Sequence, residues 1–238
     1  MTMREKLNTD LVLGTVSSNT FVPETSSGGN VGLLPLGYFM RKINSTDPTT
    51  GGNVGNISGS SHSWWRHVTA GIGANGSQTG NSFALNATTY LGIEQALKRT
   101  YNYTARGSGG APNLVVFDQI SYEIYESAMA QRQRYMDTRM ADMGFDNIKL
   151  KGATCIWDEV TPDVYTGTAA IAKGTAFFIN TNFYNLVIDS ETDIVTTPFI
   201  EPENQTAKTA KVLFMGNATC SNLRKMGVAY DILTTIVA

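Results

Sequence analysis

The central part of the chain has a helix–strand–helix pattern that restricts what it can fold into. Apolar residues recur at helical spacing between residues 86 and 103, which predicts a helix that Asn86 or Thr88 could cap. The apolar run Leu114–Phe117 is typical of a short buried strand. Asp118 follows as a good N-cap for a second helix, predicted over residues 119–143.

Strand patterns dominate the rest of the chain. They cover residues 147–157, with a break at Gly152, and then 176–179, 184–188, 211–219 and 226–237. We expect the last two to be long strands on either side of a turn at Ser221–Asn222. Because strands and helices do not alternate regularly, the order predicts an α+β fold rather than a doubly wound parallel sheet.

The N-terminal quarter is different in character. Residues 1–13 show helical spacing of Leu7 and Leu11, whereas residues 14–59 are rich in Gly, Asn, Ser, Thr and Pro. A loop-rich segment of this length is usually functional or interfacial.

Composition excludes several classes of protein. The 238 residues are 42% hydrophobic and carry a net charge of −2, so one large domain or two small ones are expected, without a general basic field for nucleic acid. No apolar run is long enough to span a membrane, and no signal peptide is recognisable. We therefore expect a cytosolic chain in which Cys155 and Cys220 are reduced, buried and inert.

The stretch SSHSWWRHV, residues 60–68, holds both histidines of the chain and two of its three tryptophans. His62 and His67 are five residues apart, which places them on different faces of a helix or a strand, and no acidic residue or cysteine lies nearby. A metal site is therefore disfavoured. We expect Trp64 or Trp65 to pack inward, and Arg66 and the histidines to face the surface or a neighbour.

The glycines of residues 71–76 match G-x-G-x-x-G, but no helix follows directly, so a dinucleotide site lacks the helix N-terminus that it needs. No G-x-S-x-G motif is present, and the carboxylate pairs Asp158/Glu159 and Glu201/Glu203 fall in predicted loops. Charges of both signs on the 119–143 helix indicate a solvated face. No catalytic residue, metal or cofactor is predicted.

A local set of basic residues could contact nucleic acid or a neighbouring subunit. It consists of Lys208, Lys211, Arg224 and Lys225.

Four segments of the C-terminal third resemble the closing segments of tailed-bacteriophage major capsid proteins, which have the Hong Kong 97-type fold. They are FFINTNF (177–183), FIEPENQ (199–205), KVLFMGN (211–217) and RKMGV (224–228). Ser63–Arg66 and Pro112–Val116 also resemble parts of those proteins.

The resemblance implies an α+β capsid fold with two parts. A peripheral domain, with a spine helix and long β-strands, would take residues 1–81 and 196–238, and an axial domain, a sheet flanked by helices, would take residues 82–195. Family members also carry an N-terminal arm and an extended loop before the spine helix, and we expect both to be missing from this sequence.

The resemblance also implies a function. The chain would be a structural subunit that self-assembles into pentamers and hexamers of an icosahedral shell, built in the host cytoplasm and retained in the virion. Its inner face would contact packaged double-stranded DNA without sequence specificity. Scaffolding, portal or decoration proteins are further expected partners, whereas a membrane is not. Candidate subunit-interface residues are Trp64, Trp65, Arg66, Asp158, Tyr165, Lys173, Arg224 and Lys225.

Two alternatives stay open. One is an encapsulin-like nanocompartment shell, which resembles the same fold but encloses cargo enzymes. The other is a nucleotide-binding enzyme that uses the glycines of residues 71–76.

Overall fold

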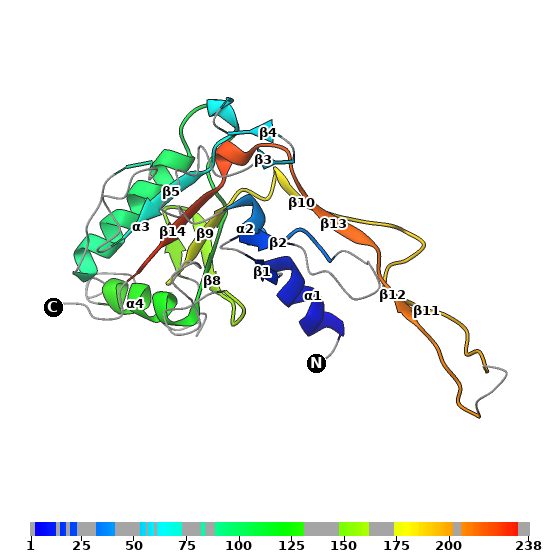
Figure 1. The fold of residues 1–238 in the computed structure, drawn as a ribbon. Helices are drawn as coiled ribbons and strands as arrows, with labels where there is room; N and C mark the ends of the chain where they lie inside the picture. Colours follow the sequence, from blue (N-terminus) through cyan, green and yellow to red (C-terminus); the bar gives the residue numbers. More distant parts are fainter. Residues whose placement is uncertain are drawn as a thin grey trace.

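The computed structural model describes residues 3–12, 15–17, 20–22, 32–40, 53–55, 57–59, 61–72, 82–83, 89–130, 148–161, 174–201 and 206–232. At its centre is a six-stranded sheet in the order β5-β14-β9-β6-β8-β7 (Figure 1). Its strands are β5 (Val68–Gly71), β14 (Gly227–Tyr230), β9 (Ala176–Ile179), β6 (Leu114–Phe117), β8 (Ala153–Trp157) and β7 (Lys149–Leu150). The pairs β5–β14 and β6–β8 are parallel, and the other neighbours are antiparallel.

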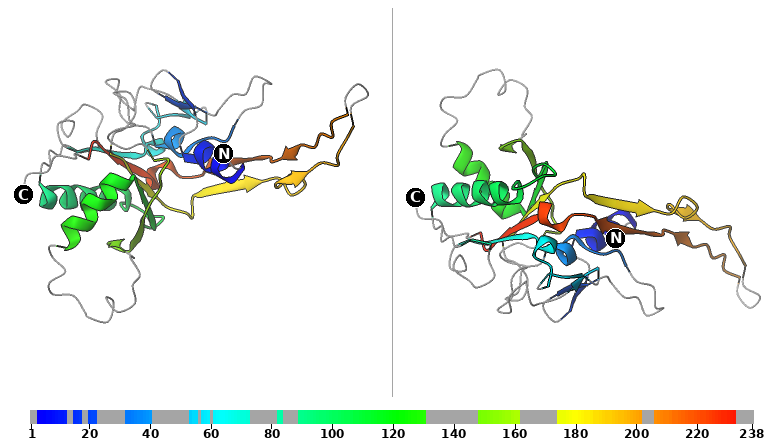
Figure 2. Two further views of the ribbon diagram at one scale, coloured as in Figure 1. Left: turned by 90° about the horizontal axis from the view of Figure 1, so that it is seen from below. Right: turned by 90° about the horizontal axis from the view of Figure 1, so that it is seen from above.

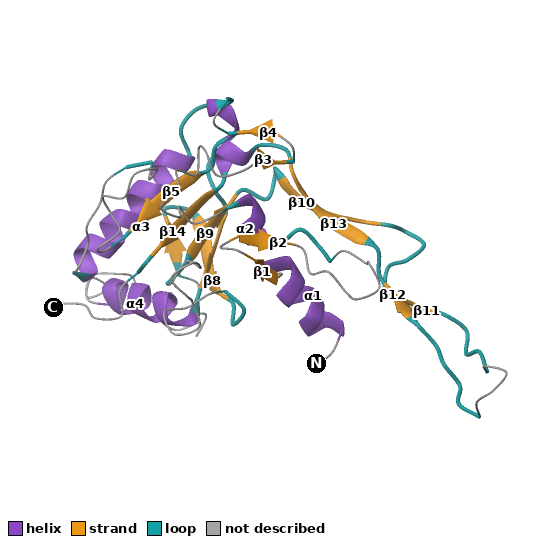
Figure 3. Ribbon diagram, in the orientation of Figure 1, coloured by secondary structure: helices purple, strands orange, loops and turns teal. Residues whose placement is uncertain are grey.

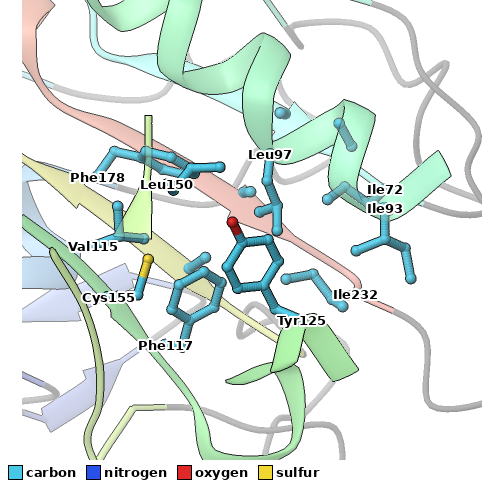
Figure 4. Packing of buried hydrophobic residues seen from close by; sticks show 14 of the residues in the cluster. Ile72, Ile93, Leu97, Val115, Phe117, Tyr125, Leu150, Cys155, Phe178 and Ile232 are labelled. Atoms are coloured by element: carbon cyan, nitrogen blue, oxygen red, sulfur yellow. The ribbon is translucent and has the colours of Figure 1, made fainter. Parts of the chain in front are cut away.

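Helices α3 (Tyr90–Thr104) and α4 (Gln119–Ala130) pack on one face of this sheet (Figure 3). Val115 and Phe117 of β6 point toward them, and Val116 points to the opposite face, as the pleat of a strand requires. Figure 4 shows the helix-side core, in which the rings of Phe117 and Tyr125 are stacked with centroids 5.7 Å apart. Helix α2 (Leu36–Phe39) contributes Leu36 to the core of the other face.

The remaining elements are short. They are α1 (Met3–Val12), the hairpins β1 (Thr15–Ser17) with β2 (Thr20–Val22) and β3 (Asn53–Val54) with β4 (Ile57–Ser58), and the 3-10 turns η1 (Ser63–Trp65) and η4 (Leu223–Lys225). The predicted helix over residues 1–13 is thus confirmed for its described part.

A long antiparallel hairpin leaves the sheet and projects away from it (Figures 1 and 2). Its base is formed by β10 (Tyr184–Ile188) with β13 (Gly216–Cys220), and farther out β11 (Val195–Thr196) pairs with β12 (Val212–Leu213). A bridge between Ile200 and Thr209 lies still farther out. We call residues 189–215 the outer arm.

Sequence and structure agree on most of the core elements. The strands predicted at 114–117, 176–179 and 184–188 are present, and Gly152, with φ of +129°, breaks the 147–157 segment into β7 and β8. Asp118 caps α4, because its Oδ2 accepts from the N–H of Ser121 at 3.0 Å. The part of the predicted 119–143 helix beyond Ala130 lies outside the described residues.

Two predictions need correction. The helix predicted over residues 86–103 is present as α3, but it begins at Tyr90, and its cap is neither Asn86 nor Thr88. Thr89 caps it, because its hydroxyl accepts from the N–H of Gly92 at 3.1 Å. The two long strands expected around Ser221–Asn222 are wrong. The first is interrupted between β12 and β13, and β14 pairs with β5 and β9 in the central sheet instead of with β13. The 3-10 turn η4 redirects the chain between them.

Candidate functional site

Some of the sequence-predicted interface residues line a pocket between three segments. The turn η1, the end of α3 with the loop after it, and the turn η4 surround a volume of about 530 Å³. Its lining consists of Trp64, Trp65, Arg106, Gly107, Ser108, Ser221, Asn222, Arg224 and Lys225. We call it the Trp–Arg pocket. Four of the eight candidate interface residues line it: Trp64, Trp65, Arg224 and Lys225.

The two tryptophans of the pocket have different roles. Trp65 is half-buried, packs against the cluster of Phe39 and Leu223, and donates its Nε1–H to the carbonyl oxygen of Val54 at 2.9 Å. Trp64 keeps 55% of its surface exposed and meets the Trp65 ring edge-on, with centroids 5.8 Å apart. The prediction that one tryptophan packs inward is confirmed, and Trp64 is left to present an aromatic surface to solvent.

Arg66 does not lie fully at the surface, contrary to expectation. It is half-buried, and its Nε donates to the carbonyl oxygen of Gly59 at 2.5 Å. This bond ties η1 to the β3–β4 hairpin. Contact of Arg66 with a neighbouring chain stays a prediction.

Lys225 holds η4 against the end of α3. Its ammonium donates to the carbonyl oxygens of Ala105, Arg106 and Gly107 at 3.4, 2.9 and 3.2 Å, and the residue is 1% exposed. Ala105 is the C-cap of α3, and Arg106 and Gly107 follow it in the loop. The ammonium thus satisfies carbonyl oxygens at the helix end and just beyond it, where a lysine is a favourable partner. Desolvation, with a contribution from the charge of Arg224, lowers the pKa of Lys225. No local pattern predicted this internal role, because the two segments are more than a hundred residues apart in sequence.

Two guanidinium groups give the pocket its charge. Arg106 lies over the Tyr103 ring, with its Cζ 3.6 Å from the centroid, and Arg224 is exposed. The lining contains no carboxylate, histidine or cysteine, and the ammonium of its lysine, Lys225, already donates to three backbone carbonyls. The lining therefore offers no thiol nucleophile and no unengaged general base. A surface of tryptophan and arginine is suited to binding an acidic or aromatic group of another molecule.

Of the other predicted interface residues that the structure describes, Arg66 and Asp158 do not line this pocket. Asp158 follows β8 and accepts from the N–H of Val160 at 2.8 Å and from Nδ2 of Asn8 at 3.0 Å, so it connects α1 to the end of a central strand. Tyr165 and Lys173 lie outside the described residues. An interface role for all eight residues stays a prediction.

Outside the Trp–Arg pocket, the described residues give little support for a nucleotide, catalytic or metal site. Gly71 ends β5, and α3 begins at Tyr90, but Gly73–Gly76 lie outside the described residues. Burial raises the pKa of the Cys155 thiol to about 12 and that of Cys220 to about 11, which makes both poor nucleophiles. Cys155 is buried within β8, whereas Cys220 ends β13 and is only half-buried. Within the described ranges, no group of three potential metal ligands is found, and no helix is long and apolar enough to cross a membrane.

Comparison with known proteins gives one informative result. No protein-family model matches the chain, and no curated protein sequence does. Among solved structures, it is similar to a chain of the cyanophage A-1(L) capsid asymmetric unit, with a TM-score of 0.54 and 13% sequence identity. The fold is that of a phage capsid protein. The match covers 96% of this chain and 65% of the cyanophage chain, so this chain spans just under two thirds of its length.

The likeness establishes a mixed helix-and-sheet capsid fold, as the sequence resemblance predicted. The division into residues 1–81, 82–195 and 196–238 stays a prediction. The structure shows that β5 and β14, from the first and last of these segments, share the central sheet with β6, β8 and β9 from the middle one.

Proposed function

We propose that the chain is a structural capsid subunit of a tailed bacteriophage, with the Hong Kong 97-type fold and its peripheral and axial parts. Copies would associate into pentamers and hexamers of an icosahedral shell around packaged double-stranded DNA. Assembly would take place in the host cytoplasm, and the protein would remain in the virion. The observation that carries the proposal is the similarity in fold to the cyanophage capsid chain over 96% of this chain.

The surface of the chain supports self-association. The outer arm exposes apolar side chains that a solitary soluble chain has no reason to keep there, and the Trp–Arg pocket offers the residue types that dominate protein interfaces. An exposed apolar surface of this kind is usually covered by another protein chain.

The test is negative-stain electron microscopy of the purified chain beside its mass in solution, over a range of salt and protein concentrations. Closed particles or ring-shaped capsomers are the expected result. A monomer under every condition, including in the presence of co-expressed scaffolding protein, would overturn the proposal.

The contents of assembled particles separate the phage capsid from an encapsulin-like shell. Phage particles purified from infected or induced cells should contain this chain together with nuclease-protected DNA. Particles that enclose a co-purifying enzyme and no DNA would replace the capsid function with that of a nanocompartment.

A further inference from the structure

The outer arm has an apolar surface that the described part of the chain leaves uncovered. Phe199 and Ile200 are 72% and 65% exposed, and exposed apolar residues continue along both strands of the arm. They are Ile194, Val195, Val212, Leu213 and Met215. A two-stranded hairpin is at best marginally stable alone in water. A partner molecule that covers this apolar surface would therefore both bury the surface and stabilise the hairpin.

The outer arm is also acidic. Between residues 189 and 215 the sequence has five carboxylates, at Asp189, Glu191, Asp193, Glu201 and Glu203, and two lysines, at Lys208 and Lys211. The Trp–Arg pocket has the opposite sign, since Arg106 and Arg224 line it and no carboxylate does. The pocket is thus aromatic and positively charged, whereas the arm is apolar and negatively charged, so the two surfaces are complementary.

The position of the two surfaces excludes contact within one chain. Ser221 and Asn222 of the pocket directly follow Cys220, which pairs with Tyr184 at the base of the hairpin. The arm extends from this base away from the sheet (Figures 1 and 2). At about 3.3 Å per residue, the sixteen steps from Tyr184 to Ile200 span up to roughly 50 Å. An arm can therefore reach a Trp–Arg pocket only on another copy.

We propose that the outer arm of one copy docks into the Trp–Arg pocket of a second copy. Phe199 and Ile200 would pack on Trp64, and Glu201 would pair with Arg106 or Arg224. The pocket, at about 530 Å³, is within the size range of sites that accept such side chains. Glu201 is already 3.2 Å from Lys208, but both side chains are exposed, so exchanging this partner costs little.

The proposed contact is heterologous, because two different surfaces of identical chains meet. Contacts of this type repeat from chain to chain and close into rings or shells when the rotation between copies permits. The inference rests on the proposed function, since it requires that the chain self-associates. It goes further by naming the two surfaces that meet.

Site-specific cross-linking tests the contact. One population would carry Ile200→Cys on the arm and the other Ser108→Cys in the pocket, both in a Cys220→Ala background. The two would be mixed before assembly and treated with a short bismaleimide. A cross-link between residues 200 and 108 of different chains, mapped by peptide mass, is expected. The matched control replaces the arm cysteine with Asn185→Cys, on the exposed base of the same hairpin, and should give no such product.

The outcomes separate this inference from the proposed function. Oligomers or particles that form without the 200–108 product would overturn the arm–pocket contact and leave the capsid function intact. A chain that stays monomeric under every condition would overturn both.

Charge reversal gives a second, independent measurement. We expect Arg224→Glu to raise the chain concentration needed for assembly roughly tenfold, because the loss of one good charged contact weakens association by about that factor. Arg224→Lys should keep most of the assembly. Lys149→Glu makes the same charge change at an exposed residue of β7 and should have no effect.

Nucleic acid is the alternative occupant of this cationic pocket. If Arg224→Glu leaves assembly unchanged and instead weakens binding of double-stranded DNA to the unassembled chain, the pocket is a DNA contact and the proposal fails.

Discussion

The central sheet and the outer arm are built on opposite principles. Strands such as β9 and β14 are buried at every position, and their side chains meet helices on one face and α2 on the other. In the outer arm, by contrast, β11 and β12 are exposed at every position. The sheet can be stabilised by the chain itself, because folding removes its apolar surface from water. The arm cannot, so its apolar residues gain their burial only from another molecule.

This contrast divides the residues of the chain by what they stabilise. Side chains in the sheet should determine whether one copy folds, and side chains in the arm should determine whether copies associate. Mutations in the two regions are therefore expected to affect different measurements.

The largest effect is expected from a pair of matched phenylalanine substitutions. Phe178→Ala removes a fully buried ring from β9 and should lower the free energy of unfolding by about 3–5 kcal/mol. Phe199→Ala, in the arm, should change it by no more than about 0.5 kcal/mol. Urea denaturation of the unassembled chain, followed by circular dichroism, measures both. A similar loss for the two variants would show that the arm is packed within its own chain, and would contradict the proposed difference between sheet and arm.

The next largest effect on the free energy of unfolding is expected at Lys225, in the turn η4 between the hairpin and β14. Lys225→Met keeps most of the apolar stem but removes the ammonium that three carbonyl oxygens accept from. We expect a loss of about 2 kcal/mol in the free energy of unfolding, the usual contribution of hydrogen bonds to a charged group. Arg224→Met at the neighbouring position is the control, because the side chain of Arg224 is exposed and makes no ion pair with the described residues. Equal effects of the two variants would contradict the internal role of Lys225.

A pH measurement probes the interior of the sheet alone. Burial raises the pKa of Cys155 from 9.0 to about 12, so between these values the unfolded chain loses a proton that the folded chain keeps. Stability therefore falls as the pH rises above 9. Between pH 8 and pH 10 the wild type should lose about 1.4 kcal/mol more than Cys155→Ala. The raised pKa of Tyr184 acts on both chains and cancels. The pKa of Tyr125 is raised first by burial, which is common to both chains, and only secondarily by Cys155. An identical pH dependence for the two chains would mean that Cys155 is accessible to solvent.

Local features of the fold were predicted better from the sequence than long-range ones. Continuous apolar runs such as Leu114–Phe117, and the capping carboxylate of Asp118, are local signals, and the structure places both as expected. Long-range arrangements leave no local signal. The pairing of β14 with β5, and the reach of Lys225 to the end of α3, depend on segments far apart in sequence. Continuous strand patterns over 211–219 and 226–237 therefore suggested a single long hairpin, where the chain instead bends at η4 and enters another sheet.

The candidate site followed the same rule. Its residue types were recognisable from the sequence, because an exposed tryptophan beside arginines is typical of interfaces. That Trp64 and Arg224 line one pocket was not predictable, since 160 positions separate them and η1 and η4 meet only in the folded chain. Arg66 was misjudged because its partner, the backbone carbonyl of Gly59, is a group that every residue carries.

The smallest effect is expected within the outer arm itself. Glu201 and Lys208 approach to 3.2 Å across the hairpin, but both side chains are about two thirds exposed. An exposed ion pair of this kind contributes no more than about 0.5 kcal/mol, because water screens it and two long side chains lose freedom to form it. Lys208→Ala should therefore leave the urea midpoint of the unassembled chain nearly unchanged. If the arm docks as proposed, the same substitution frees Glu201 for a neighbouring arginine and raises the assembled fraction slightly. Light scattering against concentration measures that gain, and a clear fall in assembly would instead place Lys208 itself in the contact between copies.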